Sequence, residues 1–267
     1  MKGSLALYVV ENGGERMLID TSTEAQAGHI VKKLKEFGTF PIHKILLTHS
    51  HWDHMQGVEE LIKLMGGAEV EVLASENAID NLKDPKYMND PFDVQAKPVE
   101  KVTPLKERDI IDLNGLKLEV INVFGHTMDS IAIFDRKNKN FFAGDAIKQK
   151  DFGNFQPLFM PPDYNELELL KTFQKLRNMK NDLNSLSLSH YGVWTDKDCI
   201  QILNYMEELN HSMQDSIIKW YNNNPSIENI ASKYHEKFVP NIEIPMEQLQ
   251  LTIDWLIKGL KMSGYIK

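Results

Sequence analysis

One short stretch of the chain brings together the side chains best suited to hold a metal ion: His49, Ser50, His51, Trp52, Asp53 and His54. It contains three imidazoles and one carboxylate, and it follows the apolar run Ile45-Leu46-Leu47. Neutral imidazole is the commonest metal ligand in proteins, and a carboxylate adds the negative charge that helps to hold a divalent ion. A polar loop that contains histidines by chance is the alternative, but the fixed spacing favours a metal site.

Other polar side chains stand just after apolar runs that are typical of buried strands: Asp20, His126, Asp145 and His190. Taken singly, each is more often structural than functional. In α/β proteins, however, the residues just beyond the ends of buried strands form the site. We therefore expect these side chains to join the histidine cluster at one edge of a sheet.

The elements that must position these residues alternate along the first 195 residues. Short apolar runs predict strands over 4–10, 16–20, 43–48, 70–74, 116–123, 131–135, 140–144 and 185–189. Helical spacing predicts helices over 24–37, 57–65, 75–82 and 165–178. Residues 83–108 are rich in Pro, Lys and Asp and predict a long irregular excursion, which is uncommon unless it borders a site.

The pattern becomes purely helical from about residue 196. Helices are predicted over 197–222, 226–236 and 246–262. We therefore divide the chain into a domain over 1–195 and a helical appendage over 196–267. Because three helices of this size have a limited core of their own, we expect the appendage to cap the edge of the site or to form a homodimer contact.

The composition narrows the functional class. A net charge of −8 argues against general nucleic-acid binding, because phosphate contact needs a basic face. No apolar run approaches the roughly 20 residues of a membrane span, and no signal peptide is seen, so we expect no membrane contact. The single cysteine, Cys199, leaves no internal disulfide and fits a reducing compartment, so we expect a cytoplasmic protein.

In this order, the motifs resemble those of the metallo-β-lactamase-fold hydrolases over about residues 4–195. The resemblance implies an α/β (α+β) fold, an αββα sandwich of two sheets with helices outside and the metals at one sheet edge. As ligands of the first metal it implies His49, His51 and His126. As ligands of the second it implies Asp53, His54 and His190, with Asp145 bridging both metals. Asp20 matches an acidic motif that supports the site through hydrogen bonds.

The chemistry of such a centre follows from its ions. Two divalent ions share a water and lower its pKa from about 15.7 toward 7, so that a hydroxide can attack a carbonyl or phosphoryl centre. Asp53 is expected to orient the hydroxide and later to protonate the leaving group. Nitrogen and oxygen ligands suit two zinc ions, although iron or manganese would fit the same set.

Within this family, the residues leave as candidates the glyoxalase II-like thioesterases, the lactonases and unassigned relatives with a helical tail. We therefore expect hydrolysis of a thioester, or of a lactone or other ester, in a small-molecule substrate. Two departures stand against glyoxalase II itself: Met55-Gln56-Gly57 replaces its usual Gly-Gly pair, and the basic residues that hold glutathione in its C-terminal region have no clear match. Against the acyl-homoserine-type lactonases, Lys148 replaces a tyrosine. Lactamases with a cysteine ligand are disfavoured because Cys199 lies outside every ligand motif.

Substrate contacts are expected from four side chains near the last ligands: Tyr191, Lys148, Phe155 and Phe159. Core packing or a solvated loop is the alternative for each. Two other functions stay open. One is a mononuclear iron oxidoreductase of the persulfide-dioxygenase type, which shares the histidines of the first site. The other is a metal-binding regulatory protein without turnover, whose helical tail binds a partner.

Overall fold

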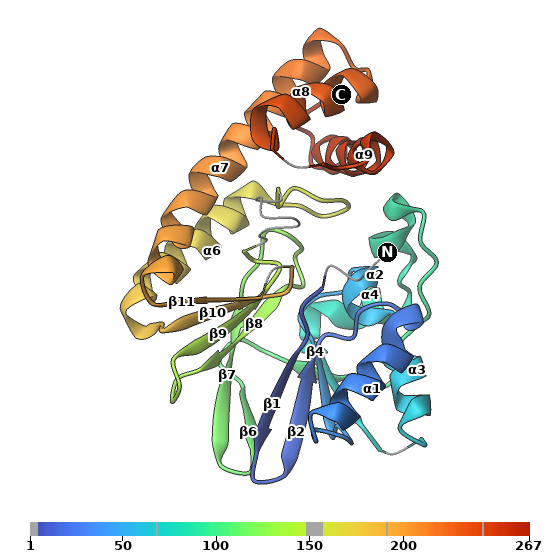
Figure 1. Ribbon diagram of the computed structural model, residues 1–267, viewed down its shortest axis with the longest axis vertical. Helices are drawn as coiled ribbons and strands as arrows, with labels where there is room; N and C mark the ends of the chain where they lie inside the picture. Colours follow the sequence, from blue (N-terminus) through green and yellow to red (C-terminus); the bar gives the residue numbers. More distant parts are fainter. Residues whose placement is uncertain (1–4, 68, 148–156, 191, 242) are drawn as a thin grey trace.

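The computed structural model describes residues 5–67, 69–147, 157–190, 192–241 and 243–267. Two β-sheets pack face to face, and helices cover the outer face of each, so that the elements form four layers (Figure 1). This arrangement confirms the predicted αββα sandwich. No helix of the described residues is long and apolar enough to cross a membrane.

The first sheet has the strand order β1-β2-β3-β4-β5. Its strands are β1 (Tyr8–Asn12), β2 (Glu15–Ile19), β3 (Lys44–Leu47), β4 (Glu71–Ser75) and β5 (Thr103–Leu105). The hairpin of β1 and β2 is antiparallel, and the remaining pairs are parallel. Helices α1 (Ala27–Glu36) and α3 (Val58–Leu64) bury their apolar faces against the outer side of this sheet.

The second sheet has the order β11-β10-β9-β8-β7-β6. Its strands are β6 (Ile110–Leu113), β7 (Leu116–Asn122), β8 (Ile131–Asp135), β9 (Asn140–Gly144), β10 (Ser185–Leu188) and β11 (Gly192–Thr195). All neighbours are antiparallel except β9 and β10. Helices α6 (Glu166–Asn178) and α7 (Asp196–Asn223) cover its outer face, and apolar side chains such as Met17, Leu46 and Ile133 fill the space between the sheets.

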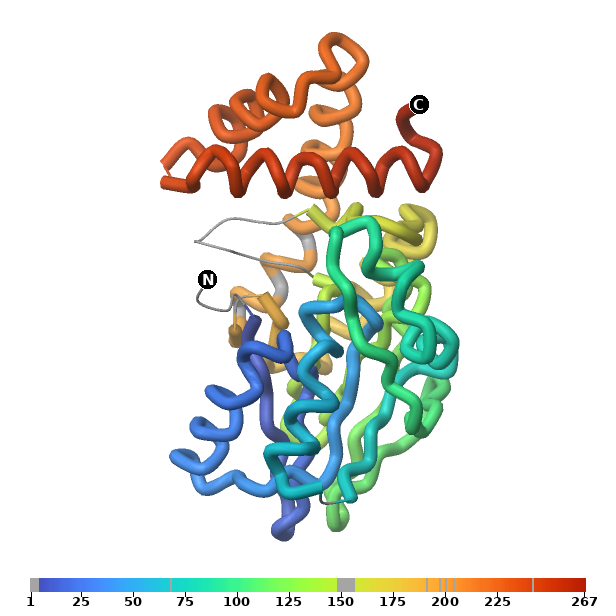
Figure 2. The backbone as a smooth tube through the Cα atoms, turned by 90° about the vertical axis from the view of Figure 1, so that its right-hand side faces the viewer, coloured from blue at the N-terminus to red at the C-terminus, as the bar shows by residue number. Residues whose placement is uncertain are grey.

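The helical region after residue 195 is packed onto the sandwich. The first half of α7 shares a core with the second sheet through Cys199, Leu203 and Met206, and this core continues into α8 (Ile227–Phe238) and α9 (Met246–Met262). Figure 2 shows α9 crossing above the loops at one end of the sandwich. The predicted boundary at residue 196 stays a prediction, although the packed core runs across it.

The predicted irregular excursion over 83–108 was partly wrong. It contains α5 (Lys86–Asn89), a 3-10 turn η3 (Asp90–Phe92) and the edge strand β5, and it follows η2 (Glu76–Ala78) and α4 (Ile79–Lys83). Strands β6 and β11 and the short helix α2 (Trp52–Met55) were also missed. These elements are four or five residues long at most, too short to show a hydrophobic period.

Candidate metal centre

The predicted site residues converge because four of them follow the carboxyl ends of strands. Asp20 follows β2, His49 follows β3, Asp145 follows β9 and His190 follows β10. Strands β2 and β3 are parallel neighbours in one sheet, and β9 and β10 are parallel neighbours in the other. The ends of these strands therefore meet at one edge of the sandwich, as the sequence predicts.

The first half-site consists of three buried histidines. The Nδ1 atom of His51 lies 3.1 Å from Nε2 of His49 and 3.1 Å from Nε2 of His126. Ligand nitrogens about 2.0–2.1 Å from a tetrahedral zinc ion are about 3.3 Å apart. The three nitrogens are therefore spaced as ligands of one ion.

The opposite ring nitrogen of each of these histidines has a protein partner. The N–H at Nε2 of His51 donates to the carbonyl of Pro161 at 3.0 Å, and that at Nδ1 of His126 donates to the carbonyl of Leu158 at 2.9 Å. Nδ1 of His49 lies 3.2 Å from the hydroxyl oxygen of Thr48. Such contacts fix the tautomer and orientation of metal-binding imidazoles, so that Nδ1 of His51 faces the Nε2 atoms of His49 and His126.

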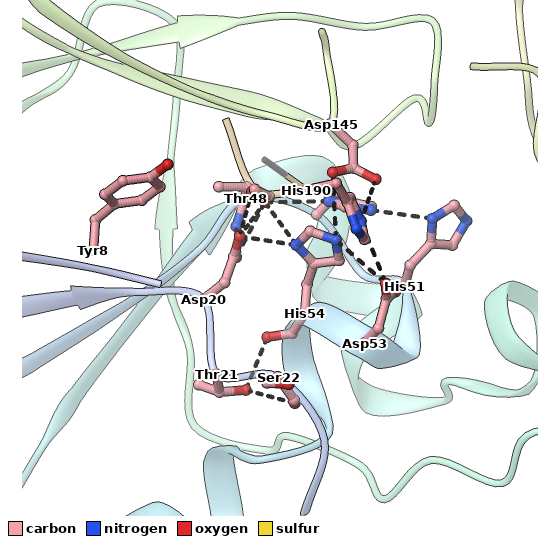
Figure 3. Close-up of polar contacts among 12 residues, drawn as sticks. Tyr8, Asp20, Thr21, Ser22, Thr48, His51, Asp53, His54, Asp145 and His190 are labelled. Carbon is pink, nitrogen blue, oxygen red and sulfur yellow. Dashed lines mark hydrogen bonds and ion pairs between the residues drawn. The ribbon is translucent and has the colours of Figure 1, made fainter. Parts of the chain in front are cut away.

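The second half-site brings Asp53, His54 and His190 together, and Asp145 lies beside His54 and His190 (Figure 3). Oδ2 of Asp53 lies 3.5 Å from Nε2 of His190 and 3.8 Å from Nε2 of His54. One oxygen of Asp145 lies 3.6 Å from Nε2 of His54, and the other lies 3.2 Å from Nε2 of His190 and 3.5 Å from Nε2 of His126. Asp145 therefore reaches ligands of both half-sites, as predicted for a bridging carboxylate.

The donor set fits divalent ions. Nε2 of His54 and Nε2 of His190 are buried and have no hydrogen-bond partner within the described part of the chain. Buried polar atoms without a partner are costly in free energy. A divalent ion bound by imidazole and carboxylate would satisfy both atoms, and all groups of described residues that could share an ion consist of the seven predicted ligands.

Asp20, which was predicted to support the site, lies behind the second half-site and contacts His54. Its carboxylate is fully buried and accepts hydrogen bonds from the backbone N–H of Thr48 at 2.8 Å and from the Thr48 hydroxyl at 2.9 Å. It also lies 2.8 Å from Nδ1 of His54, which directs Nε2 of that ring toward Asp145. Asp20 has a φ of 61°, a conformation that aspartate and asparagine tolerate better than most residues.

The two half-sites differ in their electrostatics. Burial lowers the pKa of His49 well below its usual value, and the neighbouring rings of His54 and His51 lower it further. Burial acts in the same direction on His54, but the carboxylates of Asp20 and Asp145 outweigh it and hold the pKa of His54 well above its usual value. The surroundings of His49 thus favour the neutral imidazole that metal binding requires, and the carboxylates around His54 favour a positive charge at the second half-site.

The predicted substrate contacts are only partly placed. Tyr191, Lys148 and Phe155 lie outside the described residues. Phe159 is fully buried, and its ring packs against that of Tyr164. Of the predicted ligands, Asp53 is the most accessible, with 25% of its side chain exposed, so solvent reaches the centre on that side. The four substrate contacts stay predictions.

Helix α9 covers the first half-site through contacts that the sequence did not predict. The ring of His51 packs edge-on against Phe92 with centroids 5.1 Å apart, and Phe92 packs in the same way against Trp255 at 5.2 Å. Lys258 donates to the carbonyl of Pro91 at 3.0 Å. The helical region therefore lies against the first half-site, and its expected role as a cap or a homodimer contact stays a prediction.

Gly259 fits α9 closely against the segment that orients two of the ligands. A Cβ atom at this position would lie 2.5 Å from the carbonyl oxygen of Phe159 and 2.9 Å from the carbonyl carbon of Met160. Gly259→Ala should therefore lower the free energy of unfolding by roughly 1–3 kcal/mol, although alanine is the better helix former. Urea unfolding measures this, with Gly28→Ala in α1 as control, since a Cβ there meets nothing within 4 Å. Equal effects of the two substitutions would refute the close fit.

Asp163 gives the fold a pH dependence. Burial, and then the charge of Asp129, raise the pKa of Asp163 from 3.8 to about 7. Between about pH 4 and 7 the unfolded chain loses this proton and the folded chain keeps it, so the stability contribution falls as pH rises. Asp163→Asn should remove this loss, so that between pH 4 and pH 8 the variant gains on the order of 4 kcal/mol of unfolding free energy relative to wild type. Urea unfolding of both proteins at the two pH values measures the difference, and a gain that does not change with pH would contradict it.

Comparison with known proteins agrees with this geometry. Residues 6–190 match the family model of the metallo-beta-lactamase superfamily. A probable metallo-hydrolase of Streptococcus pyogenes is 28% identical over 55% of this chain and 63% of its own length. A hydroxyacylglutathione hydrolase of Cereibacter sphaeroides is 32% identical over 50% of this chain and 44% of its own length. A human acyl-coenzyme A thioesterase is 28% identical over 44% of this chain and 46% of its own length. The chain spans about half the length of the curated relatives it matches.

Solved structures share the fold over nearly the whole chain. A metallo-beta-lactamase family protein of Thermus thermophilus aligns with a TM-score of 0.68 and 17% identity over 97% of this chain and 89% of its own. A superfamily protein of Sulfolobus tokodaii aligns with a TM-score of 0.63 and 18% identity over 96% and 92%. These matches include the helices after residue 195. The family model matches more than half of the chain, and the αββα sandwich agrees with it, so the chain belongs to the metallo-β-lactamase superfamily.

Proposed function

We propose that this chain is a dinuclear metal-dependent hydrolase that cleaves acyl thioesters. The observation that carries the proposal is the pair of half-sites joined by Asp145, whose oxygens lie 3.2 to 3.6 Å from ligand nitrogens on both sides. The full second half-site favours two ions over the single iron of the persulfide-dioxygenase alternative. Zinc suits the donor set, and manganese or iron could replace it.

The substrate class is inferred from the relatives. Their names include hydroxyacylglutathione hydrolase, acyl-coenzyme A thioesterase and an acyl-carrier-protein thioesterase. All three names describe an acyl group joined to a thiol carrier. This shared chemistry favours a thioester over the lactone or ester alternatives.

The chain's own residues divide the work between binding and proton transfer. Divalent ions held by the seven predicted ligands would supply Lewis acidity. They would also lower the pKa of water from its bulk value toward neutrality. Asp53 is the partly exposed carboxylate of the centre, so it is the group that can both meet substrate and accept a proton from the attacking water. As the carbon–sulfur bond breaks, the same carboxyl can return that proton to the leaving thiolate.

The test is metal-dependent turnover on a substrate panel. We expect protein freed of metal by chelation to be inactive, and Zn, Mn or Fe to restore hydrolysis of thioesters above that of lactones, phosphodiesters and β-lactams. His51→Ala should abolish this activity, and His29→Ala should not, because His29 is an exposed residue of α1 outside the centre. Metal-restored protein that hydrolyses none of the panel would refute the hydrolase, and a preference for lactones would refute only the substrate class.

A further inference from the structure

One buried carboxylate connects the two loops that carry the ligands of the first half-site. Asp129 is 1% exposed. Its Oδ2 accepts the hydroxyl of Ser50 at 2.5 Å, and its Oδ1 accepts the hydroxyl of Thr127 at 2.7 Å. Ser50 stands between His49 and His51, and Thr127 follows His126. Asp129 thereby ties together the backbone on which all three ligands stand.

The Asp129 contacts form a network that includes other segments. Asn81 of α4 donates to Oδ2 of Asp129 at 2.9 Å, and the hydroxyl groups of Thr127 and Ser130 lie 2.6 Å apart. Hydrogen bonds to a buried carboxylate are stronger than those between neutral groups, and breaking one leaves a buried charge poorly satisfied. The network therefore fixes one loop relative to the other.

A different residue fixes the turn that carries His190 in the second half-site. The hydroxyl of Tyr8 in β1 donates to the carbonyl oxygens of Leu188 at 2.7 Å and of Gly192 at 2.8 Å, sharing one hydrogen between them. These carbonyls are at the two ends of the turn between β10 and β11. The ring of Tyr8 packs edge-on against Phe142 of β9, the strand that leads to Asp145.

The position of the His190 ring depends on the backbone of this turn more than the positions of the other four histidine rings depend on their own backbone. The outward ring nitrogens of the other four histidines contact Asp20, Thr48, Pro161 or Leu158, as described above. Nδ1 of His190 is buried and has no hydrogen-bond partner among the described residues. The backbone of the turn must therefore do more to set the position of this ring, and Tyr8 joins both ends of that turn.

We propose that Asp129 and Tyr8 are positioning residues, each for one half-site of the centre. Asp129 holds the His49–His51 loop against the loop of His126, and Tyr8 holds the turn of His190. The proposal rests on the proposed two-ion function. It implies that the half-sites are stabilised separately, so that one can be weakened while the other is left intact.

The test is a chelator-competition titration of metal-free protein with Zn²⁺, which yields a dissociation constant for each ion. His190→Ala disrupts the second half-site, so the constant that remains belongs to the first. His51→Ala disrupts the first half-site, so the constant that remains belongs to the second. Asp129→Asn should weaken the first ion roughly 10- to 100-fold and leave the second within a factor of three, and Tyr8→Phe should do the reverse. Tyr234→Phe is the control, because Tyr234 is buried away from the centre and its hydroxyl contacts the sulfur of Met213 at 3.7 Å, so both constants should be unchanged.

The outcomes separate the positioning roles from the function. Thermal unfolding shows whether each variant folds, and Ser50→Ala, which deletes one hydrogen bond to Asp129, replaces Asp129→Asn if that variant does not. If wild type binds two ions and either variant weakens both equally or neither, the positioning roles are refuted while the dinuclear centre stands. If wild type binds only one ion, the dinuclear function is refuted together with the role assigned at the empty half-site.

Discussion

Asp53→Asn is expected to lower kcat/KM for thioester hydrolysis by roughly 100- to 10,000-fold, the range lost when a general acid–base group is removed. Asparagine has nearly the shape of aspartate and can still offer an oxygen to a metal. It cannot accept a proton from water or return one to the leaving thiolate at neutral pH. Steady-state kinetics on metal-restored protein measure the effect.

Asp53 is also a predicted metal ligand, and a loss of metal must be separated from a loss of proton transfer. Metal content should therefore be measured on the same samples, and rates compared per loaded chain. Asp93→Asn is a matched control, because the side chain of Asp93 is 85% exposed and lies outside the centre. A fully loaded Asp53→Asn protein with kcat/KM within a factor of three of wild type would rule out proton transfer by Asp53.

Asp20→Asn is expected to lower the free energy of unfolding of the metal-free protein by roughly 3 kcal/mol, because removing one partner of a buried ion pair costs about 3–5 kcal/mol. The carboxylate of Asp20 accepts from Thr48 and faces Nδ1 of His54 at 2.8 Å, and an amide nitrogen there would oppose one of these donors. The pKa of His54 should also fall, since Asp20 is the carboxylate that raises it most.

The control for Asp20→Asn is again Asp93→Asn, which makes the same change at nearly the same backbone conformation. Asp20 has φ 61° and Asp93 has φ 57°, so any effect of the left-handed conformation is shared. The exposed control should change the unfolding free energy by less than about 0.5 kcal/mol. Urea unfolding measures both variants, and equal values for the two would show that the buried hydrogen bonds of Asp20 contribute little.

The convergence of the polar side chains at the strand ends could be predicted from local sequence, whereas their assignment as metal ligands came from the family resemblance and stays a prediction. His49, Asp145 and His190 each follow a buried strand, and runs such as Ile45-Leu46-Leu47 identify those strands without knowledge of the fold. Once the ends of parallel strands are known to share an edge, the ligands must meet. The long helices were also predictable, since α9 begins and ends at the predicted residues.

The supporting contacts could not be predicted, because they join segments far apart in the chain. Tyr8 contacts the carbonyl of Leu188 across 180 residues, and Ser50 contacts Asp129 across 79. A tyrosine in an edge strand or an aspartate after a histidine motif has no local pattern that predicts such a partner. The cover formed by Phe92 and Trp255 was hidden for the same reason, and Phe92 also lies in a stretch that was predicted to be irregular.

The metal content of the purified chain tests the central claim most directly. The two half-sites predict two divalent ions per wild-type chain after loading with Zn²⁺ and removal of excess metal. They also predict one ion in His51→Ala, which keeps the second half-site, and one in His190→Ala, which keeps the first. A wild-type chain that retains one ion or none, or variants that retain as many as wild type, would contradict a dinuclear centre built from these seven side chains.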